Sequence, residues 1–301
     1  MKKQSEFTGT GVAIVTPFDA QGKPDTYALS HLVSHLAENG IDFIVVMGTT
    51  GESVSLSEDE QILVKQTVVA ANSGRCALML GLGGNNTAEL ERKLARTDFS
   101  GYQGILSVSP YYNKPSQEGI YRHYEVLASA APLPIMLYNV PGRTGSNMLA
   151  DTTLRLTAIS NIMGIKEASG NMDQISTIIR DKPQHFTVLS GDDALTLPIL
   201  ASGGDGVISV VANAFPKMFS LMVRRCMNND VAAALPVHLD LLEFTRLLFS
   251  DGNPGGIKAA LKILGLCGEH VRLPLVNIKP EIYQALVRET ERLQVKTNSL
   301  T

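Results

Sequence analysis

One lysine stands at the end of a short apolar segment. Lys166 follows Asn161-Ile-Met-Gly-Ile, whose side chains are expected to be buried in a strand. An ammonium group loses hydration in such surroundings, and the neutral amine that burial favours is a nucleophile towards carbonyl compounds. The position therefore indicates imine chemistry. The alternative is a structural lysine, which reaches solvent at the strand end or pairs with Glu167.

Hydroxyl side chains accompany three other apolar segments. They are Thr49 and Thr50 after residues 41–47, Tyr112 after residues 104–109, and Tyr138 within residues 134–139. A phenol can give and take the protons that imine formation moves, and a Thr-Thr-Gly turn offers backbone N–H groups to a carboxylate. Aromatic packing and a simple turn are the structural alternatives. The convergence of these groups with a lysine favours Schiff-base chemistry.

An arginine occupies the turn Pro141-Gly-Arg-Thr-Gly145. The guanidinium of Arg143 can bind a carboxylate through two parallel N–H groups, although a solvent-exposed loop arginine is the commoner case. The turns show no histidine or carboxylate cluster with metal-ligand spacing, and the three cysteines form no Cys-x-x-Cys pair. We therefore expect no metal site and no disulfide framework.

These residues need a scaffold that brings several strand ends together. Short apolar segments recur roughly every 28 residues, and a helical pattern follows each of them. Parallel strands that are covered on both faces give such continuous apolar runs. The pattern predicts an α/β fold, a (β/α)8 TIM barrel over residues 1–228 with the polar turns at the carboxyl ends of its strands. The segments are 11–16, 41–47, 76–81, 104–109, 134–139, 162–166, 186–190 and 206–210.

An open doubly wound sheet is the alternative arrangement of such units. It usually carries a phosphate-binding fingerprint after the first strand, where this chain has Thr16-Pro-Phe-Asp19. Helix signals support the alternation of strands and helices. They are a capping box at Ser57-Glu-Asp-Glu60, a similar start at Asn171-Met-Asp-Gln174, Thr87 before a helix, and Asn39-Gly40 after one.

Residues 229–301 contain no strand pattern and are predicted to form a C-terminal helical extension. Helices are expected over Asp230–Phe249, around Ile257–Leu264, and from Pro280 onward. The extension either covers part of the barrel's outside or provides an oligomer contact. The apolar residues that suggest such a contact are Leu239, Leu241, Leu242, Phe244, Leu247, Leu248 and Phe249.

Composition excludes several classes of protein. The 301 residues carry a formal net charge of −3, which argues against a sequence-independent nucleic-acid binder. No apolar run approaches the twenty residues of a membrane span, and no apolar signal region follows the basic start of the chain. Three unpaired cysteines fit a reducing compartment, so we expect a cytoplasmic protein with no nucleic-acid or membrane partner.

The motifs resemble those of the dihydrodipicolinate synthase/N-acetylneuraminate lyase family over residues 7–280. They are Gly48-Thr-Thr-Gly-Glu52, Pro110-Tyr-Tyr-Asn113, Tyr138-Asn-Val-Pro141, Arg143-Thr-Gly145, Gly164-Ile-Lys-Glu-Ala168, Ser190-Gly-Asp-Asp193 and Gly206-Val-Ile-Ser-Val210. The resemblance implies an imine between Lys166 and pyruvate, which condenses with L-aspartate-4-semialdehyde in lysine and diaminopimelate biosynthesis. It implies no metal or organic cofactor, and a homotetramer that is a dimer of dimers.

Site roles follow from the same resemblance. It implies a proton relay of Thr49, Tyr138 and Tyr112, with Tyr112 reaching in from a neighbouring subunit. The remaining roles are Thr50 for the pyruvate carboxylate, the main chain of Ile208 for the pocket wall, and Arg143 for the carboxylate of the semialdehyde. A sugar-acid lyase of the same family is the alternative, and Arg143 argues against it. A catalytically inactive barrel that binds an oxo acid is a further alternative.

The family's lysine-binding cleft maps to Ser53, Val54, Glu58, Gln61, Asn85, Glu89 and Tyr111. Asn85, Glu89 and Tyr111 match lysine-sensitive members. Many of those members have histidine or another aromatic residue at the Glu58 position and histidine at the Gln61 position. We therefore expect a lysine site that is weak or absent.

Overall fold

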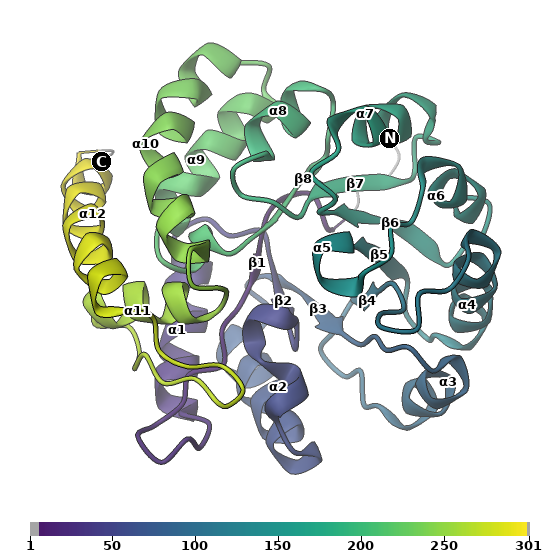
Figure 1. Cartoon of the computed structure of the whole chain (residues 1–301), viewed down its shortest axis with the longest axis horizontal. Helices are drawn as coiled ribbons and strands as arrows, with labels where there is room; N and C mark the ends of the chain where they lie inside the picture. Colours follow the sequence, from purple (N-terminus) through teal and green to yellow (C-terminus); the bar gives the residue numbers. More distant parts are fainter. Residues whose placement is uncertain (1–5, 300–301) are drawn as a thin grey trace.

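The computed structural model describes residues 6–299 and contains a closed barrel of eight parallel strands (Figure 1). Every predicted segment overlaps one strand, which confirms the (β/α)8 fold. The strands are β1 Gly9–Ala13, β2 Phe43–Val46, β3 Ala77–Gly81, β4 Gly104–Val108, β5 Ile135–Asn139, β6 Ile162–Glu167, β7 Thr187–Ser190 and β8 Gly206–Ser209.

Closure of the barrel comes from β1, which pairs in parallel with both β2 and β8. An apolar cluster that includes Phe43, Met79 and Leu189 fills the interior, while side chains such as Ile44 and Val188 face the surrounding helices. Both faces of each strand are therefore buried. This explains why the strands appear in the sequence as continuous apolar runs.

Helices and short 3-10 turns connect the strands. Up to the last strand they are α1 Thr26–Glu38, η1 Thr49–Gly51, η2 Ser53–Ser55, α2 Glu58–Asn72, α3 Thr87–Arg96, α4 Gln117–Ala130, α5 Pro141–Thr144, α6 Ala150–Leu156, α7 Met172–Asp181 and α8 Thr196–Ala201. Ser57 and Glu60 form the predicted capping box of α2. The cap of α3 is Asn86, one residue before the predicted Thr87, whose hydroxyl instead contacts Nδ1 of His123 at 2.8 Å.

The segment after β8 is helical: η3 Val211–Asn213, α9 Pro216–Met227, α10 Val231–Phe249, α11 Gly255–Ile263 and α12 Pro280–Asn298. In Figure 1, α10 and α12 lie beside the barrel, next to α9 and α1. One hydrophobic cluster includes residues of β2, α9, α10 and α12. The division of the chain at residue 228 stays a prediction, since this core crosses it.

The apolar surface expected on α10 is mostly internal. Leu241, Phe244 and Leu248 are buried in the core of their own chain, because α10 packs on α9 and α12. Leu239 and Phe249 remain 56% and 41% exposed. The covering role predicted for the extension is therefore confirmed, and only part of its apolar surface is left for another subunit.

No helix between residues 6 and 299 is both long and apolar enough to cross a membrane. Residues 1–5, on which the expectation of no secretion signal rests, lie outside the described range, as do residues 300–301 at the end of the predicted extension.

Candidate active site

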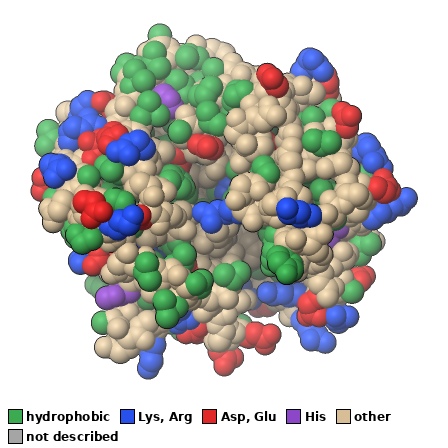
Figure 2. All heavy atoms as spheres, viewed as in Figure 1, with side chains coloured by type: hydrophobic (Ala, Val, Ile, Leu, Met, Phe, Trp, Pro, Cys, Tyr) green, Lys and Arg blue, Asp and Glu red, His purple; other side chains and the backbone are tan. Residues whose placement is uncertain are grey.

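A cavity of about 400 Å³ opens at the carboxyl ends of the strands. Figure 2 shows the surface of the molecule in the orientation of Figure 1, and this face is hollowed near its centre. The cavity brings together Lys166, Tyr138, Thr49, Thr50 and Arg143. Five of the predicted site residues therefore line one cavity, although they come from β5, β6 and the turns that follow β2 and β5.

Lys166 reaches this cavity from the middle of the barrel. Its side chain is in the buried class, at 6% exposure, and Nζ lies 4.3 Å from the centre of the Tyr138 ring. The two residues are direct register partners on β6 and β5. Among the described residues Lys166 has no salt-bridge partner. A largely desolvated amine beside a phenol is the arrangement that imine formation requires.

Glu167 lies on the opposite face of β6, because side chains alternate along a strand. Its carboxylate accepts hydrogen bonds from the Ser169 backbone at 2.8 Å and from the side chains of Asn139 and Gln174 at 3.1 and 3.3 Å. Burial raises the pKa of Glu167 above its usual range. Lys166 therefore does not pair with Glu167, and that structural alternative is excluded.

Gly191 makes room for the lysine. A Cβ at this position would lie 2.7 Å from Cβ of Ala168 and 3.1 Å from Cε of Lys166. Any larger residue at this position would crowd the Lys166 side chain. Gly191 belongs to the motif Ser190-Gly-Asp-Asp193, but its role could not be predicted from sequence, because the close approach exists only in the folded chain.

The threonine turn after β2 is held from two sides. Oγ1 of Thr16 donates a 2.7 Å hydrogen bond to the carbonyl of Gly51, and the N–H of Glu52 donates to the carbonyl of Thr49 at 3.1 Å. Glu52 adopts the left-handed conformation, with φ of 51°, and this ends η1. The turn thereby presents Thr49 and Thr50 to the cavity.

Two residues of the C-terminal extension also line the cavity, Phe249 and Asn253. Nδ2 of Asn253 donates a 2.9 Å hydrogen bond to Oγ1 of Thr50. Because Thr50 accepts this bond, its own hydroxyl hydrogen is free to point at a ligand. Neither residue was predicted to line the site, since no sequence motif links the extension to the threonine turn; Asn253 and Thr50 are more than 200 residues apart.

Arg143 is exposed and lines the mouth of the cavity from α5. The short helix has Pro141 at its first position and ends at Gly145 with φ of 76°, a conformation that glycine adopts without strain. Asp192 lines the same cavity from the end of β7. A guanidinium at this rim can bind a carboxylate of a ligand that enters from solvent.

Tyr112 lies apart from this cavity within its own chain. Its side chain is 87% exposed, and its backbone has φ of 72°, a strained value for a residue with a Cβ. The N–H of Tyr112 donates to the carbonyl of Thr144 at 3.2 Å, which ties the tyrosine loop to α5. One chain alone does not bring Tyr112 to Lys166.

Ile208 packs in the barrel interior. Val210, just after β8, is the residue from this strand end that lines the described cavity. The carboxylate of Asp193 accepts hydrogen bonds from the backbone N–H groups of Val210 and Val211, at 2.9 and 3.1 Å. Burial raises the pKa of Asp193 to about 6. This buried carboxyl group fixes the chain where it leaves β8.

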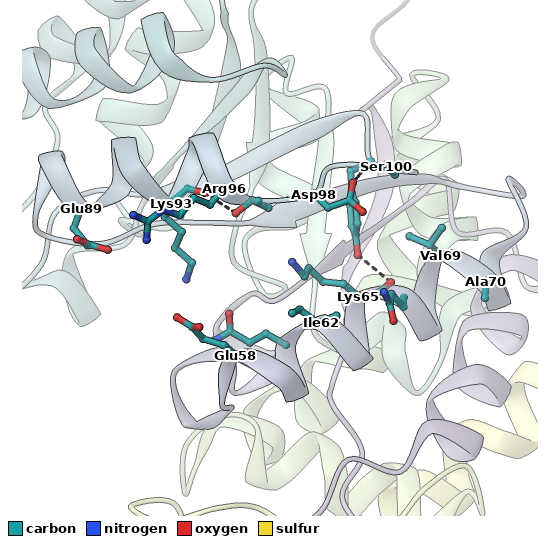
Figure 3. Close-up of a pocket in the computed structure, with 14 residues that line it drawn as sticks. Glu58, Ile62, Lys65, Val69, Ala70, Glu89, Lys93, Arg96, Asp98 and Ser100 are labelled. Atoms are coloured by element: carbon teal, nitrogen blue, oxygen red, sulfur yellow. Dashed lines mark hydrogen bonds between the residues drawn. The ribbon is translucent and has the colours of Figure 1, made fainter.

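The predicted lysine-cleft residues lie outside this cavity. Glu58, Gln61 and Glu89 line a separate groove of about 740 Å³ between α2 and α3. Figure 3 shows Glu58 of α2 and Lys93 of α3 facing each other across it. Gln61 also donates to the carbonyl of Ser53 at 3.2 Å. Asn85 is not part of the groove lining, and its side chain donates to the carbonyl of Tyr111 at 3.0 Å.

Within residues 6–299, no group of three or more histidine, cysteine, aspartate or glutamate side chains is placed to hold a metal ion.

A (β/α)8 barrel with a buried lysine amine in its carboxyl-end cavity has the architecture of a class I aldolase-type lyase. The sequence model of the Dihydrodipicolinate synthetase family matches residues 6–293. The chain belongs to this family.

Individual relatives agree over nearly the whole chain. The 4-hydroxy-tetrahydrodipicolinate synthase of Flavobacterium psychrophilum is 49% identical over 288 residues, which cover 95% of this chain and 98% of the relative. The crystal structure of dihydrodipicolinate synthase from Aquifex aeolicus superposes with a TM-score of 0.92 at 39% identity, covering 96% and 98% of the two chains. The structure of DHDPS from Cyanidioschyzon merolae with lysine bound has a TM-score of 0.90 at 40% identity, covering 95% and 98%.

Proposed function

We propose that this protein condenses pyruvate with L-aspartate-4-semialdehyde to give 4-hydroxy-tetrahydrodipicolinate, a step of lysine and diaminopimelate biosynthesis. The observation that carries the proposal is the position of Lys166, whose amine lies 4.3 Å from the Tyr138 ring in the cavity that Arg143 borders. The relatives named 4-hydroxy-tetrahydrodipicolinate synthase support this substrate pair.

The reaction begins at Lys166. Its amine attacks the keto carbon of pyruvate, and loss of water leaves an imine. Loss of a methyl proton converts the imine to an enamine, whose carbon attacks the aldehyde of the second substrate while the aldehyde oxygen takes up a proton. The amino group of the semialdehyde then attacks the imine carbon, closes the ring and releases Lys166.

Proton transfers in this sequence are assigned to hydroxyl groups. Tyr138 and Thr49 line the cavity, and Tyr112 of the partner subunit completes the relay. The hydroxyl of Thr50, whose oxygen already accepts a bond from Asn253, donates to the pyruvate carboxylate. The main chain at Ile208 contributes to the wall beside it. Arg143 binds the carboxylate of the semialdehyde through its two parallel N–H groups.

The relay implies an assembly, and we assign the protein to a homotetramer, a dimer of dimers, in the cytoplasm. The exposed, strained Tyr112 supports a subunit contact at this loop. Val54 and Leu273 add apolar side chains that are 93% and 80% exposed in one chain. A sedimentation experiment tests the assembly: a tetramer is expected, and a monomer with full activity would contradict the role of Tyr112.

The activity is tested by pyruvate-dependent consumption of aspartate semialdehyde, coupled to an NADPH-dependent reductase that consumes the cyclic product. Turnover is expected in the wild-type chain and should vanish in Lys166→Ala. Borohydride with pyruvate should attach a three-carbon adduct to Lys166, detectable by peptide mass. Adduct formation without turnover of the semialdehyde would indicate a sugar-acid lyase, and absence of the adduct would indicate an inactive barrel.

We further propose that lysine inhibits this enzyme weakly or not at all. Glu58 and Gln61 stand where many sensitive members have aromatic or histidine side chains. One oxygen of Glu89, Oε2, forms a surface ion pair with Arg92 at 2.6 Å, which competes with binding of a lysine ammonium group. A lysine titration that abolishes activity at micromolar concentration would overturn this proposal. The residues that would form the site are Ser53, Asn85, Glu89 and Tyr111.

A further inference from the structure

A buried ion pair joins the C-terminal extension to the threonine turn. Nζ of Lys258, in α11, lies 2.5 Å from Oε1 of Glu52, and the side chains are 0% and 2% exposed. Lys258 also donates to the carbonyl of His270 at 2.8 Å and lies 4.0 Å from the centre of the Phe18 ring. All strong partners of this ammonium group are therefore inside the protein.

The second oxygen of the same carboxylate is also engaged. Oε2 of Glu52 accepts a 3.0 Å hydrogen bond from the N–H of Arg272. The guanidinium of Arg272 donates to the carbonyl of Ser55 at 2.8 Å and to Glu60. The Glu52 carboxylate is thus bound by Lys258 and Arg272 of the extension. The segment that follows Glu52 is hydrogen-bonded to Arg272 as well.

Glu52 is directly connected to the substrate-facing threonines. Its N–H closes the turn on the carbonyl of Thr49, and its left-handed backbone directs the chain away from the cavity. A shift of the Glu52 carboxylate therefore moves Thr49 and Thr50. Displacements of about 1 Å in a reacting site can cost about a hundredfold in rate.

Buried ion pairs are on average poor stabilisers, because both charges lose their hydration. An apolar pair of similar volume would hold this region without that desolvation cost. The charged pair adds geometric specificity to the contact. A directed ion pair can fix one register between α11 and the turn, and the Asn253–Thr50 hydrogen bond joins the extension to the same turn. We propose that Lys258 and Glu52 are positioning residues, which set the Thr49–Thr50 turn for imine formation with pyruvate. This inference rests on the proposed function.

The test compares three variants, Lys258→Met, Glu52→Gln and the double variant, with the wild-type chain. Each single variant is expected to lower kcat about tenfold to a hundredfold. KM for pyruvate should rise, whereas KM for the semialdehyde should stay within twofold, because Arg143 lies on α5 and is not held by this pair. The double variant should be no slower than the slower single variant, because both changes remove the same interaction between Lys258 and Glu52.

A matched control comes from the opposite end of the barrel. Nζ of Lys182 pairs with Asp205 at 2.9 Å and donates to the carbonyl of Phe186 at 2.7 Å, next to the amino ends of β7 and β8. Lys182→Met removes a partly buried ion pair, whose side chains are 13% and 31% exposed, far from the threonine turn. Its kcat and both KM values are expected to stay within twofold of the wild-type values.

The rate at which borohydride traps the pyruvate imine, measured without the second substrate, reports on the same threonine turn. It should fall in Lys258→Met and in Glu52→Gln, even if the wild-type chain fails to use the semialdehyde and the proposed synthase activity is wrong. Folded variants with an unchanged trapping rate and unchanged pyruvate KM would overturn the positioning role. Loss of folding in both single variants would also overturn it, since the pair would then serve stability alone.

Discussion

Lys166 and Tyr138 are register partners on adjacent strands, and the lysine amine lies 4.3 Å from the centre of the tyrosine ring. This contact places the nucleophile against the face of the ring and holds it in the cavity. The phenol is thereby kept within the site where imine formation releases and consumes protons. We expect the ring to orient the amine and the hydroxyl group to carry the protons.

Tyr138→Phe separates these two contributions. The ring contact with Lys166 is retained, so the thermal midpoint should change little, while the proton carrier is lost. General acid–base groups contribute about 10² to 10⁴ in rate, and we expect kcat to fall within that range. The coupled assay measures the loss. A variant with at least one third of the wild-type kcat would show that the hydroxyl group does not carry protons.

Gly191→Ala tests the space around the nucleophile. The new methyl group would lie 3.1 Å from Cε of Lys166 and 2.7 Å from Cβ of Ala168, so the lysine must move. We expect kcat and the pyruvate trapping rate to drop by about tenfold or more. Gly84→Ala is the control, because its methyl group would make only ordinary contacts, at 3.5 Å from Leu90. Equal rates in the two variants would contradict the role of Gly191.

Asp193 makes the stability of the β8 end depend on pH. Burial raises its pKa from 3.8 to about 6, so the folded chain binds this proton more tightly than the unfolded chain. The corresponding stabilisation is present below pH 4 and is lost as the pH rises to about 6. Two pKa units correspond to about 3 kcal/mol.

Asp193→Asn removes this titration and keeps an oxygen that can accept from Val210 and Val211. Urea unfolding at pH 4 and pH 7 measures the effect. The free energy of unfolding of the wild-type chain, relative to the variant, should be higher at pH 4 than at pH 7 by about 2 kcal/mol. A difference that does not change with pH would show that the Asp193 pKa is the same in the folded and unfolded chains.

The barrel was predictable because its signals are local. Segments such as Phe43–Val46 are apolar on both faces, and the Ser57–Glu60 capping box marks a helix start within four residues. The strand order then follows from the long crossover connections, which make parallel pairing the natural arrangement. The lysine, the tyrosine and the threonine turn were predicted together because all stand at strand ends.

The missed residues depend on contacts between distant parts of the chain. Asn253 reaches Thr50, and Lys258 reaches Glu52, across more than 200 residues of sequence. Neither has a spacing pattern that marks it, and a lysine in an amphipathic helix is usually on the surface. The apolar residues of α10 were overestimated as a surface for the converse reason, since only packing on α9 and α12 shows that Phe244 is internal.

Arg143 distinguishes the synthase activity from the sugar-acid lyase activity, both of which would use Lys166. We propose that its guanidinium binds the carboxylate of the semialdehyde in the synthase reaction, and no other arginine or lysine besides Lys166 lines the described cavity. Arg143→Lys keeps the charge and loses the two parallel N–H groups, so the loss measures bidentate binding and not charge alone. We expect KM for the semialdehyde to rise about tenfold, which corresponds to about 1.4 kcal/mol.

Pyruvate binding should be unaffected by Arg143→Lys, because the imine forms deeper in the cavity at Lys166. Pyruvate KM and the trapping rate are therefore the internal control, measured on the same preparation. A rise in both KM values would place Arg143 in the folding of α5 and not at a substrate carboxylate. An unchanged KM for the semialdehyde would make it an ordinary loop arginine and would remove the main argument against a sugar-acid lyase.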